Sequence, residues 1–110
     1  MADTAARLYG PTALGTSAVT IYTSAASTTT IVRHIIVCNT TTAASAFTLS
    51  IGADAVGTRL FHKYPVEGTT NGISFFEWKG FVVLAAAEII QAYADDASTC
   101  TMSVFGVKVT

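Results

Sequence analysis

The chain has little charge of either sign. Asp, Glu, Lys and Arg make up 12% of its 110 residues, against roughly a quarter in an ordinary soluble domain. The six Lys and Arg are scattered from Arg7 to Lys108 and form no stripe that could neutralise a row of phosphates, so we expect no nucleic-acid partner. A surface so poor in charge favours association. We therefore expect copies of the chain or a larger assembly to cover much of it; the alternative is a neutral, Thr-rich monomer.

The chain also lacks a basic leader and a long apolar run. Its start, "MADTAARLYG", does not have the pattern of a signal peptide, and the longest apolar stretch, residues 81–96, is interrupted and too short to span a bilayer. We expect the protein to be made and kept in a cytoplasm, or released by something other than secretion, and to have no membrane partner. The two cysteines, Cys38 and Cys100, are then expected to be buried free thiols, although a bond between them stays open.

Groups that could carry chemistry are few. His34 and His62 lie in different strand-like segments. His34 and Cys38 would point to the same face of one strand, but about 13 Å apart, too far for one metal ion to bind both. The acidic pair Asp95 and Asp96 is typical of a solvated turn. We expect no enzyme, no metal site and no cofactor.

Short alternating segments recur about every ten residues between Gly, Asn, Pro or Asp, which is typical of a β-sandwich or barrel. Residues 28–39 are nearly all β-branched and apolar on both faces, as in a central strand covered on both sides. The alternation assigns one face of this strand to Ile31, Arg33, Ile35 and Val37. In the next strand, it points Phe47, Leu49 and Ile51 inward.

The first fifteen residues differ from the rest. Pro11 and two glycines argue against a helix longer than a turn. We predict an extended N-terminal arm at residues 1–15 that packs Leu8 and Tyr9 on its own domain or on a neighbour. Residues 16–110 form a single all-β domain, a β-sandwich of about eight short antiparallel strands.

The stretch "FVVLAAAEIIQAYADD", residues 81–96, has two interpretations. Its alanines favour a helix by propensity. That helix would be apolar nearly all round and would lack a clear N-cap before Phe81. Divided at residues 85–88, the stretch gives two strands joined as a hairpin, and this is the interpretation we adopt.

The aromatic segment "ISFFEWKGF" also has two interpretations. Phe75 shares a face with Ile73, and Phe76 and Trp78 share the other. If Phe75 belongs to the core, Phe76 and Trp78 are exposed and suit a protein interface or a sugar-stacking platform. The other interpretation is a strand covered on both faces.

Three segments resemble small virion proteins of tailed bacteriophages: "TTTIVRHIIVCNTTTAASAFTLSIGADAVGTRLF", "FVVLAAAEIIQAYADD" and "MSVFGVKV". In that pattern a strand ending in Asn precedes a strand like "TLSIG", then an apolar hairpin and a closing strand. The similarity extends over most of residues 15–109. Ala87 departs from it, because the pattern has Gly at that turn.

The resemblance implies a jelly-roll-like sandwich and a non-enzymatic structural protein of the virion, assembled in the host bacterial cytoplasm. It implies a capsid decoration (cement) protein that stabilises the shell as a homo-oligomer, a trimer in proteins of this size, against the major capsid protein or another virion protein. The alternative is a tail- or fibre-associated module that binds a host-surface glycan or receptor. We assign the interface to five residues: Arg7, Leu8, Tyr9, Phe76 and Trp78.

Overall fold

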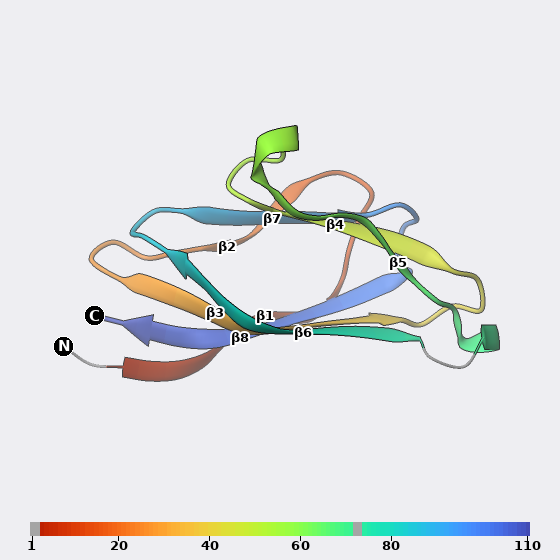
Figure 1. Ribbon diagram of the computed structural model, residues 1–110, viewed down its shortest axis with the longest axis horizontal. Coiled ribbons are helices and arrows are strands. Elements are labelled where there is room, and N and C mark those ends of the chain that lie inside the picture. The colour runs from red at the N-terminus through yellow and green to blue at the C-terminus, as the bar shows by residue number, and fades with distance from the viewer. Residues whose placement is uncertain (1–2, 72–73) are drawn as a thin grey trace.

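The computed structural model describes residues 3–71 and 74–110. Two antiparallel sheets of four strands pack face to face, which confirms the all-β sandwich (Figure 1). Sheet A has the order β1-β8-β3-β6, and sheet B has the order β2-β7-β4-β5. The strands of sheet A are β1 (Asp3–Ala13), β8 (Cys100–Val109), β3 (Thr29–Asn39) and β6 (Phe75–Leu84). Those of sheet B are β2 (Val19–Thr23), β7 (Ile89–Ala94), β4 (Ser45–Ile51) and β5 (Arg59–Val66). Two single turns of 3₁₀ helix, η1 (Val56–Thr58) and η2 (Thr69–Asn71), flank β5.

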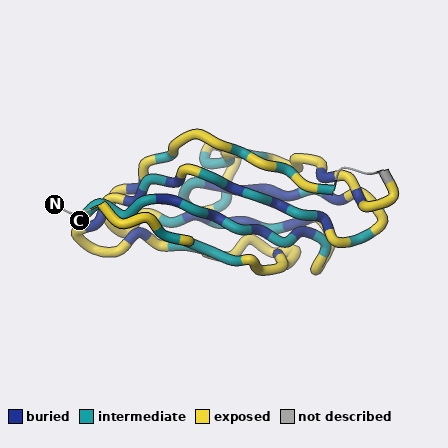
Figure 2. The backbone as a smooth tube through the Cα atoms, turned by 90° about the horizontal axis from the view of Figure 1, so that it is seen from below, coloured by how far each residue is buried: buried dark blue, intermediate teal, exposed yellow. Residues whose placement is uncertain are grey.

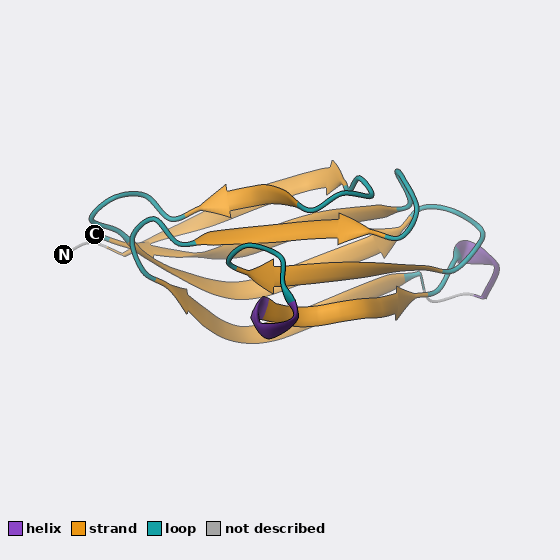
Figure 3. Cartoon of the chain, turned by 90° about the horizontal axis from the view of Figure 1, so that it is seen from above, coloured by secondary structure: helices purple, strands orange, loops and turns teal. Residues whose placement is uncertain are grey.

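The strands pair in a nested order. β4 pairs with β5, β3 with β6, β2 with β7 and β1 with β8, so the chain forms a long antiparallel hairpin wound on itself. Pairing of β3 with β8 and of β4 with β7 then joins these ribbons into the two sheets (Figure 3). A jelly roll has this kind of nesting, and that finer description of the sandwich stays a prediction.

Residues 81–96 form strands, as predicted. β6 ends at Leu84, β7 begins at Ile89, and Ala87 takes a positive φ of 68° in the turn between them. The Glu88 carboxylate accepts a hydrogen bond from the Ala85 N–H at 2.6 Å and closes this turn. The predicted hairpin was wrong, because β6 pairs with β3 in sheet A whereas β7 pairs with β2 and β4 in sheet B.

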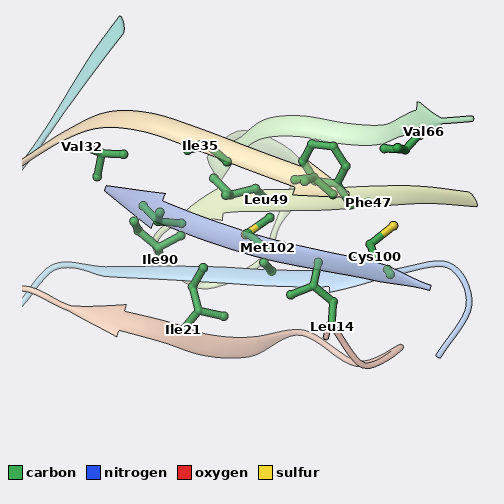
Figure 4. Close-up of a cluster of buried hydrophobic side chains, with 14 of the residues drawn as sticks. Leu14, Ile21, Val32, Ile35, Phe47, Leu49, Val66, Ile90, Cys100 and Met102 are labelled. Atoms are coloured by element: carbon green, nitrogen blue, oxygen red, sulfur yellow. The ribbon is translucent and has the colours of Figure 1, made fainter. Parts of the chain in front are cut away.

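The core lies between the sheets and draws side chains from both (Figure 4). Phe47 and Leu49 on β4 are fully buried, and Ile51 packs against the core from its edge, as the alternation predicts. Burial of this apolar surface is the main driving force for folding. The buried apolar residues are Leu14, Ile21, Val32, Ile35, Val37, Phe47, Leu49, Val66, Leu84, Ile90, Ala92, Ala94, Cys100, Met102 and Val104.

β3 does not keep one alternation along its length. Its register shifts between Val32 and His34 against both neighbours. Relative to β8, Arg33 is an extra residue, as in a β-bulge; relative to β6, the extra residue lies on β6, between Lys79 and Val82. Val32 and Ile35 therefore both point into the core. The face predicted for Ile31, Arg33, Ile35 and Val37 was wrong, because the bulge separates Ile31 from the inward-pointing Ile35 and Val37.

The segment predicted as an arm is extended and forms β1, the edge strand of sheet A beside β8. Leu8 and Tyr9 pack against the core of their own chain. The division into an arm at residues 1–15 and a domain at 16–110 stays a prediction. Within the ranges described, the structure has no helix long and apolar enough to cross a membrane.

Candidate interface on the outer face of sheet A

The outer face of sheet A carries apolar side chains that nothing in the described chain covers. On β6 the exposed fractions are 56% for Phe75, 71% for Phe81 and 53% for Val83. Figures 1 and 2 show sheet A as an outer layer with no described loop lying over it. We call this surface the A-face. Its apolar residues are Ile31, Ile36 and Cys38 on β3, Phe75, Phe81 and Val83 on β6, and Phe105 and Val107 on β8.

A small polar group lies within the A-face. The His34 Nε2 and Glu77 Oε2 atoms are 2.7 Å apart, and the Lys79 ammonium lies 4.0 Å from the other Glu77 oxygen. The ring centroids of His34 and Phe105 are 5.8 Å apart. Such half-exposed ion pairs contribute little to folding. At an interface they fix the orientation of a partner, because charges must meet their opposites.

The structure places four of the five predicted interface residues against the core. Leu8, Tyr9, Phe76 and Trp78 pack on the core cluster and are partly buried, whereas Arg7 is exposed on β1. Of the two interpretations of the aromatic segment, the one with Phe75 in the core and with Phe76 and Trp78 exposed was wrong, because Phe75 points outward on β6. The interface role of the five residues stays a prediction.

Phe76 and Trp78 belong to an aromatic cluster that bridges the two sheets. The ring centroid of Phe76 lies 4.5 Å from that of Tyr64, 5.2 Å from that of Phe61 and 5.5 Å from that of Phe47. Trp78 meets Phe61 edge to face at 6.3 Å. Each such pair contributes roughly 0.5–1.5 kcal/mol beyond its burial. Phe76 and Trp78 thus pack between the two sheets, whereas Phe75 and Phe81 lie on the A-face.

Gly80 allows Trp78 to lie flat along β6. A Cβ atom at Gly80 would approach the Trp78 indole to 2.8 Å, closer than two carbon atoms can come. The Gly80 carbonyl accepts a hydrogen bond from Arg33 Nε at 3.2 Å, which ties the bulge of β3 to β6.

The loop between β4 and β5 lies over part of the outer face of sheet B (Figure 3). Ser50 on β4 donates a hydrogen bond to Asp54 in this loop at 2.8 Å, and Arg59 Nε donates another at 3.1 Å. The Asp54 N–H donates to Gln91 on β7 at 2.9 Å. The hydrogen bond from Arg59, followed by that from Ser50, lowers the pKa of the Asp54 carboxyl.

The groups considered for chemistry lie apart. His34 is on the A-face and His62 is exposed on β5. Both cysteines are free, and burial raises the pKa of the Cys100 thiol, which makes it a poor nucleophile. Within residues 3–71 and 74–110 there is no pocket and no group of three or more His, Cys, Asp or Glu residues placed to hold a metal ion.

No protein-family model matches the chain, and neither a curated protein nor a solved structure matches it. The uncovered apolar surface of the A-face is therefore the structural feature that bears on function. One signal in the sequence could have revealed it: in "FFEWKGFVVL" both alternating sets contain large apolar residues, although one set also holds Glu77 and Lys79. A strand of a two-layer sandwich can bury only one set.

Proposed function

We propose that the chain is a non-enzymatic structural protein of a bacteriophage virion, a capsid decoration (cement) protein that stabilises the shell through oligomeric surface contacts. Its partners are further copies of itself and the major capsid protein or another virion protein. It would be assembled onto the particle in the host bacterial cytoplasm.

The A-face is the observation that carries this proposal. Monomeric proteins rarely leave a large contiguous apolar patch exposed, and such a patch marks an interaction site. Here three large side chains of one strand are each more than half exposed in a chain that has only 12% charged residues. The family resemblance of the strand pattern supplies the virion context.

The alternative, a tail or fibre module that binds a glycan, rests on Phe76 and Trp78. Both pack toward the core in the aromatic cluster, so neither offers an open ring face for a sugar. No described feature favours this second function.

The test is binding to preassembled capsid shells that lack this protein, from the bacteriophage that encodes it. Two matched variants separate the A-face from the opposite side: Val83→Lys on β6 and Val56→Lys on the loop above sheet B, where Val56 is 86% exposed. Each replaces an exposed Val by Lys. Bound and free protein are measured after sedimentation of the shells.

We expect the unaltered chain and Val56→Lys to sediment with the shells and to raise the temperature at which they come apart. Val83→Lys should bind at least about tenfold more weakly, because a lysine must be desolvated at an apolar contact. A chain that stays in the supernatant at all concentrations would contradict the proposal. Equal binding by the two variants would remove the A-face as the contact.

A further inference from the structure

The four edge strands of the sandwich differ in how well they resist pairing with another chain. β1 contains Pro11 and two register shifts, β2 has five residues and one shift, and β5 contains Pro65 and two shifts. Proline, bulges and short length are the usual means of keeping an edge unpaired. β6 has ten residues without proline and one register shift, between Lys79 and Val82; its half from Phe75 to Lys79 lies before the shift and pairs with consecutive residues of β3.

In this half of β6, every second residue directs its backbone N–H and C=O groups toward the open edge of sheet A. The Asn39 N–H donates to the Ser74 carbonyl at 2.7 Å, so Ser74 faces β3. Backbone groups alternate in direction along an antiparallel strand. Phe76 and Trp78 therefore also face β3, and the N–H and C=O groups of Phe75, Glu77 and Lys79 face the open edge.

Charge then selects one antiparallel register for two copies of β6. Opposed residues must point to the same face, so the A-face residues of one copy oppose those of the other. Placing Glu77 opposite Glu77, or Lys79 opposite Lys79, sets like charges against each other. The register centred on Trp78 places Glu77 of each copy opposite Lys79 of the other, within the regular half of β6.

We propose that β6 pairs antiparallel with β6 of a second copy, about a two-fold axis at Trp78, to form one continuous eight-stranded sheet. Glu77 and Lys79 exchange backbone hydrogen bonds twice across the axis, and their side chains form two ion pairs. The inference rests on the self-association in the proposed function and deepens it: it assigns a two-fold contact, where the family resemblance implies a trimer.

The test is a charge exchange followed by light scattering. Glu77→Lys alone opposes lysines, and Lys79→Glu alone opposes glutamates, so each should raise the dissociation constant of the dimer about tenfold or more. Mixing the two single variants restores both ion pairs in a heterodimer. The double variant, Glu77→Lys with Lys79→Glu, restores them in a homodimer. Circular dichroism on each sample shows whether the sandwich is intact.

We expect the unaltered chain, the mixture and the double variant to be dimers, and each single variant to be a monomer at the same concentration. The mixture guards against misfolding, because Glu77→Lys also removes the contact with His34. A trimer, or a dimer that the single variants leave intact, would overturn the pairing. A monomeric unaltered chain would overturn it too and would assign Lys79 the role of keeping the edge unpaired.

Capsid binding distinguishes this failure from failure of the proposed function. Lys79→Glu, added to the same shells, should still bind through the rest of the A-face, although with lower apparent affinity because the dimer no longer contributes two contacts. Loss of dimerisation with retained shell binding would leave the proposed function standing.

Discussion

The outer faces of the two sheets differ in the side chains that they carry and in whether a loop lies over them. Sheet B carries buried hydroxyl groups there, at Thr48 and Ser50. Ser50 donates a hydrogen bond to Asp54 in the loop between β4 and β5, and Thr48 accepts one from the Lys63 N–H on β5. Sheet A leaves phenylalanine and valine side chains uncovered and places one small polar group among them. A loop thus lies over part of the polar face, and no described segment lies over the apolar face.

The difference indicates which face would gain more from contact with another molecule. A polar face under a loop is satisfied within the chain and gains little from a partner. An apolar face gains free energy from any partner that removes it from water, by roughly 25 cal/mol for each Å² buried. The four predictions below test this contrast, from the largest expected effect to the smallest.

The largest effect is expected in the core that both sheets share. Phe47→Ala removes a fully buried ring that contacts Phe61, Tyr64 and Phe76, and should lower the free energy of unfolding by about 3–5 kcal/mol. Phe75→Ala on the A-face is the matched control and should change it by less than about 0.5 kcal/mol. Denaturant unfolding measures both. Similar losses would mean that Phe75 is buried in the folded protein.

The next effect tests the covered face. Thr48→Val removes the hydroxyl that accepts the Lys63 N–H at 3.0 Å and leaves that donor unpaired, at a cost of about 1–3 kcal/mol. Thr48→Ser keeps the hydroxyl and should retain most of the stability. If Val is tolerated better than Ser, shape and not the hydrogen bond decides this position.

A third prediction uses pH. The pKa of Asp54 is lowered in the folded chain, so its contribution to stability is fully present above the carboxyl's unfolded value, about 3.9. It is lost as the pH falls through the lowered value. Unfolding measured between pH 6 and 2 should therefore show a steeper loss below about pH 4 for the unaltered chain than for Asp54→Asn. Parallel curves would contradict the role of Asp54 in holding the loop.

The smallest effect on folding is expected on the A-face. Phe75→Thr with Phe81→Thr replaces two exposed rings by a residue that suits strands and should change the free energy of unfolding in dilute solution by less than about 1 kcal/mol. Retention on a hydrophobic column should fall clearly. Unchanged retention would show that these rings are covered in solution.

Local alternation predicts the strands but not their neighbours. The strand character of residues 81–96 follows from apolar residues on both sides of a turn. Nothing in that stretch says that β6 and β7 join different sheets, because the partner strands lie far away in the sequence. The bulge at Arg33 is likewise decided by pairing with β8, so the face of Ile31 could not be predicted from β3 alone.

The candidate site was missed for a related reason. Phe75 and Phe76 have the same side chain, and composition cannot say which of them points into the core. The choice is made by the cluster of Phe47, Phe61 and Tyr64 on sheet B, which offers a place to Phe76.

The nested pairing also sets the order in which the chain can close. β4 and β5 are neighbours in the sequence, whereas β1 and β8 lie at opposite ends of the chain. Contacts between distant segments form late, because the loop-closure entropy must be overcome first. We expect folding to proceed outward from β4 and β5, on the millisecond-to-second scale of β-sandwiches. Until β8 pairs with β3, both edges of the β3–β6 ribbon are open. Mispairing between chains is therefore most favoured while many copies are being synthesised close together and have not finished folding.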